Sequence, residues 1–435
     1  MLNFDCDGFY GTLFAIEGIS DGRAVLNGPT GCRGHPAYFS DRVFSRNNPF
    51  KKINPEEFFF FGLPRIPLTY LDADDYIAGS GEKLEAILPK IADMDGSFIA
   101  IVNSPGASLI GDDLNRFLRD AGLQERCMAF ESSSYSETVA AGFDAAIVSV
   151  LKWLKLNRLP GIKKRINLLG LSIYHKHWEG TRDELVKICM LMGLDVISSP
   201  GAGSSVAEMK ESASASFNVI VFPEYSERTA GWYEDELGIP SIRSPHGAPV
   251  GFSATEEWIN TIADATGADP EPALDYIKEM RRIAFHKLGR FYNERGFPKG
   301  MTFSVEADAS IALPLVRWLY EYLNMFPVSV SIKPESDAGY GRTLCDFLES
   351  NSIGESLRVR PDDVPSDVFV GEGLKGSILR NNGLCLANID IANRSGDYID
   401  VVPKTHLGGA GALYLLEQIL NAANRIRYKN FLNKK

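Results

Sequence analysis

Two cysteines near the amino terminus are the residues best suited to redox chemistry. Cys6 is followed 26 residues later by Cys32, which ends the stretch Asn27-Gly28-Pro29-Thr30-Gly31-Cys32. A thiolate is the usual protein ligand of an iron–sulfur cluster, and backbone N–H groups that converge on the sulfur tune its potential. The spacing by itself favours ordinary packing, because free cysteine is among the residue types most often buried.

Length, charge and cysteine content limit the class of protein. The 435 residues allow two to three domains, and 45 basic against 56 acidic residues give a net charge of −11. This balance predicts neither a nucleic-acid partner nor affinity for an anionic membrane. The chain has no charged-then-apolar leader and no apolar run of membrane-spanning length, so we expect a soluble, cytoplasmic protein. Its cysteines are then reduced, and we expect Cys127, Cys189, Cys345 and Cys385 to be core residues.

Strand-like and helical patterns alternate along the chain, which predicts an α/β fold with mostly parallel sheets. Strand patterns cover residues 98–103, 165–171, 194–197, 218–222, 301–305, 328–332, 367–370 and 383–388, and helical patterns cover 114–121, 182–192, 206–214, 272–294, 311–323 and 413–425. We predict three domains: 1–160 with the two cysteines, 161–294 with a bridging helix, and 295–435 with a carboxyl-terminal helix.

Polar side chains follow several of these strands. In a parallel sheet, ligands bind beyond the carboxyl ends of the strands. His175 and His177 follow the first strand of the second domain, Glu224 follows its third, and His246 and His406 come after later turns. An imidazole with a near-neutral pKa could donate protons to a reduced substrate. These five residues are therefore candidate proton donors or substrate contacts, although each histidine alone is more often a core or surface residue.

Two glycine-rich turns have the composition of nucleotide sites but not the rest of the motif. Gly79-Ser80-Gly81 precedes a helix and could bind phosphate, yet no Walker-type lysine follows. The turn Gly408-Gly409-Ala410-Gly411 has no strand directly before it and no evident ribose-binding acid. We expect neither turn to bind a nucleotide.

The cysteine region and several later segments resemble one known family. From Cys6 through Gly11, Gly18-Ile19 and Gly28 to Cys32, the chain resembles the start of nitrogenase component 1 subunits and of their relatives in dark-operative protochlorophyllide reductase, coenzyme F430 biosynthesis and cofactor assembly. Similar segments occur at Leu68–Leu84, Leu109–Asp113, Pro249–Thr255 and Thr405–Ala412. The resemblance covers nearly the whole chain.

The resemblance implies a fold, a cofactor and a partner. The fold is three Rossmann-like domains, each a mostly parallel sheet flanked by helices. The cofactor is an iron–sulfur cluster at a subunit interface, with Cys6 and Cys32 as ligands and Gly28, Gly31, Arg33, His35 and Ser104 around it. Electrons would come from a separate iron protein, which also binds and hydrolyses the ATP.

The chain departs from the family pattern at three positions. The third cluster cysteine falls on Pro105, beside Ser104, and proline cannot ligate iron. The cysteine that binds the catalytic cofactor of nitrogenase falls on Phe222, and its histidine ligand falls on Leu407 rather than on His406. Dinitrogen reduction is therefore disfavoured. A [4Fe–4S] cluster normally takes four ligands, so two must come from a second copy or from a paralogous subunit.

Three functions remain open at this point. The first is a subunit of a nitrogenase-like, ATP-dependent reductase, and the second is a scaffold on which a metal–sulfur or tetrapyrrole cofactor is assembled. The third is a cluster-free structural or binding subunit. The residues do not distinguish a tetrapyrrole substrate from a small thioether, an alkyne or another metallocofactor, nor a cluster of four irons from one of eight.

Overall fold

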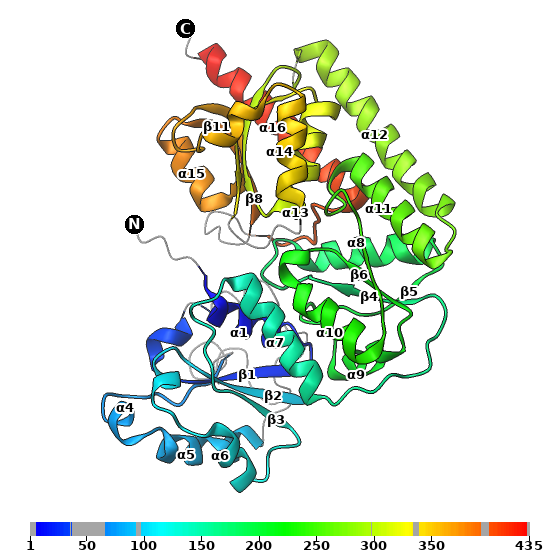
Figure 1. Cartoon of the computed structure of the whole chain (residues 1–435). Helices are drawn as coiled ribbons and strands as arrows, with labels where there is room; N and C mark the ends of the chain where they lie inside the picture. Colours follow the sequence, from blue (N-terminus) through cyan, green and yellow to red (C-terminus); the bar gives the residue numbers. More distant parts are fainter. Residues whose placement is uncertain are drawn as a thin grey trace.

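Three parallel sheets, one after another along the chain, form the framework of the protein (Figure 1). The computed structural model describes residues 6–34, 36, 66–92, 97–296, 298–333, 339–392 and 400–432. The strands are β1 Gly22–Asn27, β2 Phe98–Asn103 and β3 Cys127–Phe130 in the first sheet, β4 Arg165–Leu169, β5 Asp195–Ser198, β6 Phe217–Ile220 and β7 Ser241–Arg243 in the second, and β8 Thr302–Ala307, β9 Phe326–Ile332, β10 Ser366–Glu372 and β11 Cys385–Ala392 in the third. The predicted α/β fold of three sheets is confirmed.

Helices cover these sheets and connect their strands. They are α1 Gly8–Glu17, α4 Asp75–Ala78, α5 Gly81–Ala92, α6 Leu114–Asp120, α7 Val139–Trp153, α8 Trp178–Leu191, α9 Val206–Glu211, α10 Glu227–Leu237, α11 Gly251–Thr266, α12 Glu271–Arg295, α13 Ala309–Arg317, α14 Tyr340–Ser350, α15 Gly373–Asn381 and α16 Gly408–Leu432. Short 3-10 turns lie at 107–109, 212–214, 223–225 and 354–358, and a π-helical turn at 318–322 continues α13. No helix of the described segments has both the length and the apolar character of a membrane span.

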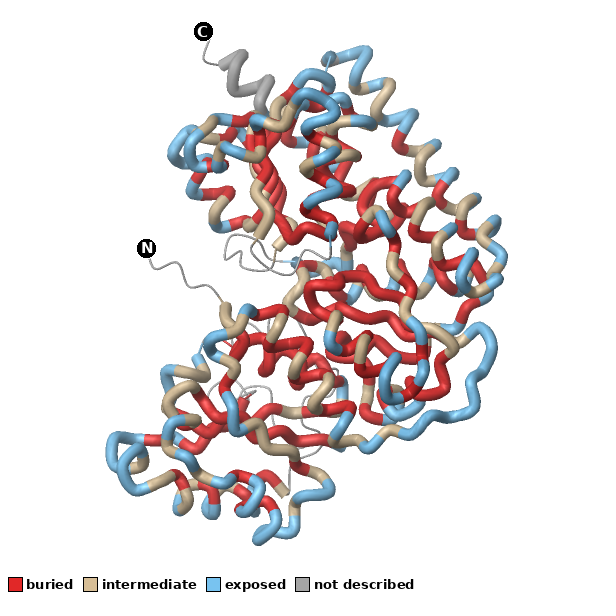
Figure 2. Tube along the Cα trace, in the orientation of Figure 1, coloured by how far each residue is buried: buried red, intermediate tan, exposed pale blue. Residues whose placement is uncertain are grey.

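The strand orders place a switch point in the second and third sheets. The second sheet runs β5-β4-β6-β7 and the third runs β11-β10-β8-β9. In the second sheet, β5 pairs with one edge of β4 and the next strand, β6, pairs with the other edge. In the third sheet, β9 and β10 flank β8 in the same way. A crevice opens at such a point, outside the carboxyl ends of the strands. The central strands are almost wholly buried, as their apolar runs predict (Figure 2).

Close backbone contacts hold the first sheet and its helices together. A Cβ atom at Gly11 of α1 would lie 2.0 Å from the carbonyl oxygen of Val139, and one at Gly142 of α7 would lie 2.2 Å from that of Gly8. Only glycine therefore permits this approach of α1 and α7. Asp7 caps α1, because its Oδ1 accepts hydrogen bonds from the amides of Phe9 (3.0 Å) and Tyr10 (3.3 Å).

The glycine- and serine-rich loop after β5 attaches the first sheet to the second. The amide of Gly203 donates to the carbonyl of Gly18 at 2.7 Å, and the amide of Ser20 donates to the carbonyl of Ser204 at 3.0 Å. A Cβ at Gly18 would lie 2.0 Å from the carbonyl oxygen of Gly201. This loop is therefore a docking element between two units of the fold.

Helices α12 and α16 join the second and third sheets. Helix α12 connects them along one side of the molecule (Figure 1), and α16 packs against α8, α11 and α12. The Tyr340 hydroxyl donates to the carbonyl of Ser244 at 2.7 Å across this junction. The carboxyl ends of the two sheets are thus held facing each other.

Two expectations about single residues can be compared with the structure. Cys127, Cys189 and Cys385 are buried, as predicted, but Cys345 is only partly buried. It directly follows Leu344, which lies on the buried stripe of α14, so the helical turn carries its side chain away from the core.

At the Gly79-Ser80-Gly81 turn, the Ser80 amide and hydroxyl both donate to Asp112 Oδ2 at 2.6 Å. A carboxylate of the chain itself thus occupies the start of α5.

Candidate functional site

The two amino-terminal cysteines lie at the same end of α1. Cys6 and Cys32 are both partly buried, and both pack against the main hydrophobic core. Burial raises the pKa of Cys32, and the charge of Asp7 raises it further. Asp7 caps α1 and directly follows Cys6, so Cys32 lies within electrostatic range of the start of α1. The predicted pair is therefore brought into one region of the first domain.

The turn around Cys32 is held by contacts to neighbouring loops. The amide of Gly28 donates to Thr69 Oγ1 at 3.0 Å. A Cβ at Gly28 would lie only 2.6 Å from Ser104 Oγ, whereas one at Gly31 would meet nothing within 4 Å. Gly28 therefore serves close packing, while Gly31 faces open space.

The other residues predicted around the cluster differ in environment. Ser104 is fully buried, and its Oγ accepts a hydrogen bond from the Ala107 amide at 3.2 Å. Its hydroxyl is thus used within its own turn. The guanidinium of the partly buried Arg33 donates to the hydroxyl of the exposed Tyr70 at 3.4 Å. His35 lies outside the described residues.

Among its described residues, the cysteine region presents too few ligands to enclose a metal by itself. Within the described segments, no group of three or more His, Cys, Asp or Glu side chains is placed to hold a metal ion. Two partly exposed thiols fit a cluster that is completed by a second polypeptide, since iron–sulfur clusters of this kind normally take four thiolates. The raised pKa of Cys32 disfavours the thiolate in the metal-free chain, so bound iron would have to supply the positive charge that keeps this ligand deprotonated.

Three of the predicted histidines gather between the second and third sheets. His175 and His177 follow β4, and His406 precedes α16. The His177 and His406 rings are 4.9 Å apart between centroids, and both contact the ring of Tyr414. His175 and His406 line a common cavity of about 30 Å³. In each of the three rings, Nε2 is buried and has no hydrogen-bond partner among the described residues.

These imidazoles are neutral near pH 7. Burial lowers the pKa of His175 to about 3, and the charge of Lys333 contributes. Burial lowers the pKa of His177 to about 4 against the opposing effect of Asp400, and burial puts the pKa of His406 well below its usual value. The expectation of a near-neutral pKa is therefore wrong for these three, because it did not include their removal from water.

Glu224 is a predicted residue whose pKa lies near neutral. It follows β6, is buried, and accepts hydrogen bonds from the Ser310 amide (2.9 Å) and hydroxyl (2.8 Å) at the start of α13. Burial raises its pKa to about 7, and the nearby charge of Asp308 adds to the shift. This carboxyl group thus links the two sheets at their carboxyl ends.

His246 lies in a separate pocket. Its Nδ1 is 3.2 Å from a guanidinium nitrogen of Arg317 and 3.5 Å from Glu257 Oε2. With these residues it lines a cavity of about 30 Å³ that contains none of the other candidate residues. The structure therefore does not join His246 to the histidine group.

The charged centre of the site was not predicted from the sequence. Lys176 Nζ lies 2.7 Å from Asp390 Oδ2 and 3.1 Å from Asp400 Oδ2, and the Lys176 and Asp390 side chains are 6% and 3% exposed. Such a buried charge needs a partner. The position of Lys176 between two predicted histidines was a signal, but nothing in the sequence pairs it with Asp390 on β11.

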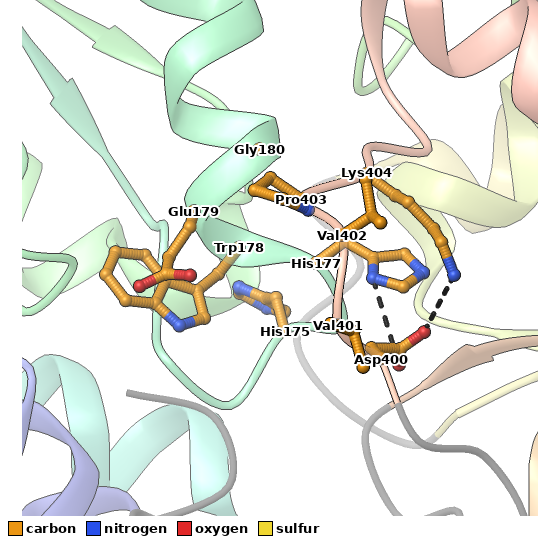
Figure 3. Close-up of a pocket in the computed structure, with 10 residues that line it drawn as sticks. All are labelled: His175, His177, Trp178, Glu179, Gly180, Asp400, Val401, Val402, Pro403 and Lys404. Atoms are coloured by element: carbon orange, nitrogen blue, oxygen red, sulfur yellow. Dashed lines mark hydrogen bonds and ion pairs between the residues drawn. The ribbon is translucent and has the colours of Figure 1, made fainter. Parts of the chain in front are cut away.

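A polar pocket of about 120 Å³ lies beside this charged centre (Figure 3). It is lined by His175, His177, Trp178, Glu179, Gly180, Asp400, Val401, Val402, Pro403 and Lys404. The first residues of α8 form one wall, and the segment before α16 forms the other (Figure 3). The pocket therefore joins the second and third sheets at their carboxyl ends.

Comparison with known proteins gives one family and one fold. The sequence model of the nitrogenase component 1 type oxidoreductases matches residues 8–424, which confirms the resemblance seen in the sequence. Curated relatives include a subunit of the light-independent protochlorophyllide reductase of Rhodospirillum rubrum, 26% identical over 49% of this chain and 41% of the relative. The corresponding subunit from Synechococcus sp. (strain CC9605) is 26% identical over 61% of this chain and 52% of the relative. The chain thus spans about half or less of the length of these relatives.

Solved structures agree with the fold over nearly the whole chain. A structure of nitrogenase Cp1 at pH 6.5 superposes with a TM-score of 0.73 at 17% identity, covering 98% of this chain and 94% of that one. A second, of nitrogenase Cp1 at pH 5, gives a TM-score of 0.70 at 15% identity, with 97% and 89% covered. At this identity the agreement establishes the three-sheet architecture.

Proposed function

Because this chain belongs to the nitrogenase component 1 type oxidoreductase family, we propose that it is a subunit of a nitrogenase-like, ATP-dependent reductase. In this proposal a separate iron protein hydrolyses ATP and delivers electrons, and the two components meet in the cytoplasm. The observation that carries the proposal is the pair Cys6 and Cys32, two partly exposed thiols at the same end of α1.

Cys6 and Cys32 would hold an iron–sulfur cluster together with thiolates from another subunit. When bound, the cluster supplies one-electron transfer. This chain contributes the two thiols, the turn that carries Cys32, and the Asp7 cap that fixes the start of α1 beside them. Ser104 and Pro105 offer no third thiolate, so the partner is either a second copy of the chain or a paralogous subunit.

Reduction also consumes protons, and we assign their delivery to Glu224. Its carboxyl group is buried at the crevice between the second and third sheets, and its pKa of about 7 lets it hold and release a proton near neutral pH. The neutral rings of His175, His177 and His406 would contact the substrate without donating charge. Relatives are protochlorophyllide reductase subunits, so an organic substrate of the tetrapyrrole class is the one we favour.

Anaerobic purification tests the cluster. We expect iron and sulfide to copurify with the protein, and we expect Cys6→Ala and Cys32→Ala each to remove most of both. Cys345→Ala is the matched control, because this cysteine is also partly buried but lies on α14, in the third unit. Equal iron and sulfide in all four proteins would contradict the assignment of the ligands.

A cluster-free binding subunit is the second candidate function. It is favoured by Pro105 and Ser104 at the position of the third family cysteine, and by the use of the Ser104 hydroxyl within its own turn. This candidate predicts no iron, no sulfide and no visible iron–sulfur absorption under strictly anaerobic conditions. An assembly scaffold would instead bind a labile intermediate and pass it on, so iron would be lost to an acceptor protein without substrate turnover.

A further inference from the structure

The start of α8 presents unused hydrogen-bond donors to the polar pocket. Its N-cap is His177, which has a left-handed backbone (φ 59°) and makes no side-chain cap. The Trp178 amide donates to the His175 carbonyl at 3.2 Å, but the amides of Glu179 and Gly180 have no hydrogen-bond partner within the described segments. Both residues line the pocket. The positive end of a fourteen-residue helix therefore faces this space.

A buried imidazole provides a second, independent sign of a ligand. The side chain of His177 is 3% exposed, it lines the same pocket, and its Nε2 has no partner in the part of the chain that the structure describes. Its Nδ1 is 4.0 Å from Asp400 Oδ2, beyond hydrogen-bond reach, so either nitrogen of the neutral ring can carry the proton. A buried donor without an acceptor is destabilising. An acceptor atom in the pocket would remove that penalty.

His175 adds a donor whose tautomer is fixed. Its Nδ1 accepts a hydrogen bond from the Ser172 amide at 3.1 Å, so the proton of the neutral ring must be on Nε2. This Nε2 is buried, has no partner among the residues described, and belongs to a ring that also lines the pocket (Figure 3). The start of α8 and both histidine rings therefore border one pocket.

The charges around the pocket select the kind of acceptor. The Lys404 ammonium lies 3.0 Å from Asp400, which is also paired with Lys176, so these charges largely balance. The Glu179 carboxyl lies beside Trp178, on the other side of the pocket from Lys404 (Figure 3). With two carboxyl groups already present, a dianion such as phosphate would be repelled about twice as strongly as a monoanion. A single negative charge spread over two oxygens can use the free amides, the imidazole N–H groups and Lys404.

We propose that this pocket binds a carboxylate group, and that this group anchors the substrate of the reductase. The second half of this inference rests on the proposed function, whereas the first half concerns the pocket alone. A volume of about 120 Å³ suits a small acidic arm and is below the roughly 300 to 1,000 Å³ typical of sites that enclose a whole ligand. The rest of the substrate would lie outside the pocket.

Binding of propionate to the full chain, measured by ligand-observed NMR, tests the pocket. Propionamide is the matched neutral probe, and inorganic phosphate is the dianionic one. We expect propionate to bind at least about tenfold more tightly than propionamide, since the helix end and Lys404 act on charge. Equal binding of the acid and the amide, or tighter binding of phosphate, would overturn the proposal.

Two substitutions at one position separate the backbone donor from the side chain. Glu179→Ala and Glu179→Pro both remove the carboxyl group, but only proline also removes the amide N–H, and proline is tolerated in the first turn of a helix. We expect propionate to bind Glu179→Pro about tenfold more weakly than Glu179→Ala. Lys404→Met gives an independent measurement if the proline variant does not fold. We expect it to weaken propionate binding about threefold or more. Unchanged affinity in Lys404→Met and in the folded Glu179 pair would overturn the site.

The outcome is separable from that of the proposed function. If the protein carries iron and sulfide but binds propionate and propionamide equally, only the carboxylate site is contradicted. If the protein binds propionate selectively but contains no iron, the carboxylate site stands and the proposed reductase function is contradicted.

Discussion

The cysteine region around Cys6 and Cys32 differs from the histidine pocket, by which we mean the polar pocket together with the buried imidazoles of His175, His177 and His406. The difference is in where the reactive side chains find their partners. Cys6 and Cys32 are partly exposed and provide two thiols where a cluster normally takes four. Around the pocket, Lys176 and Asp390 are almost completely buried and paired with each other, and three neutral imidazoles have buried Nε2 atoms without partners among the described residues. In the proposed function the first region is completed by another polypeptide, while the second is assembled within this chain.

This difference predicts where the chain is sensitive to change. Removing one member of a buried ion pair leaves an uncompensated charge in the protein interior. When one member of an exposed pair is removed, water solvates the charge that remains. The histidine pocket should thus control the stability of the isolated chain. The cysteine region should tolerate most side-chain changes, except where backbones touch directly.

Substitution of the buried lysine is expected to have the largest effect. Lys176→Met leaves the Asp390 carboxyl group, which is 3% exposed, without its cation, and should lower the free energy of unfolding by about 3–5 kcal/mol. The measurement is urea unfolding at pH 7. Lys83→Met is the control in the first unit, because Lys83 pairs with Asp72 and Asp75 at the surface. A loss for Lys176→Met no larger than for the control would show that the buried pair does not hold the two sheets together.

The proton held by Glu224 is expected to make stability depend on pH. Its folded pKa of about 7 lies above the usual 4.5, so between these values the folded state binds more protons than the unfolded state. Stability from this group is therefore fully present below about pH 4.5 and is lost as the pH rises through about 7, by up to about 3 kcal/mol.

Glu224→Gln isolates this contribution, because the amide does not titrate in this range. We expect the free energy of unfolding of the wild type to fall relative to that of the variant between pH 5 and pH 7.5. The histidines, whose folded pKa values are lowered, produce the opposite slope below pH 6.5 and are common to both proteins, so they cancel in the difference. Parallel pH profiles would mean that Glu224 is ionised throughout.

A backbone contact in the cysteine region gives a smaller effect. Gly11→Ala places a methyl group 2.0 Å from the Val139 carbonyl oxygen, which should separate α1 from α7 and cost about 1–3 kcal/mol. Gly31→Ala is the control, since its Cβ would meet nothing within 4 Å. If α1 positions Cys6, Gly11→Ala should also lower the iron content of anaerobically purified protein while Gly31→Ala does not. Equal stability of the two variants would contradict the close packing of α1 and α7.

Much of this architecture could be predicted from local sequence patterns. The apolar run at 98–103 predicted β2 with its observed bounds, and the pattern at 272–294 differs from α12 by one residue at each end. Strand β1 was missed, because its apolar run is only three residues long, Ala24–Leu26, and lies between Arg23 and Asn27. The start of α8 was placed four residues late, since His177 is not among the residues that normally cap a helix.

The candidate site was less predictable, because it depends on contacts between distant parts of the chain. The rule that ligands bind beyond strand ends located His175, His177 and Glu224. It could not reveal that Lys176 pairs with Asp390, 214 residues further along the sequence. Nor could it reveal the neutral state of the imidazoles, which comes from burial between two sheets rather than from neighbouring residues.

Thiol labelling gives the most sensitive comparison and requires no change in stability. Cys6, Cys32 and Cys345 are partly exposed, whereas Cys127, Cys189 and Cys385 are buried and their pKa values are raised by burial to about 11, 12 and 11. A maleimide at pH 7.5, read out by mass spectrometry, should therefore label the first three in the folded protein and the others only after unfolding. Cluster-loaded protein should show protection of Cys6 and Cys32 but not of Cys345. Labelling of Cys6 and Cys32 at the same rate with and without iron would separate these thiols from the metal, and the cysteine region would then be only a packing site.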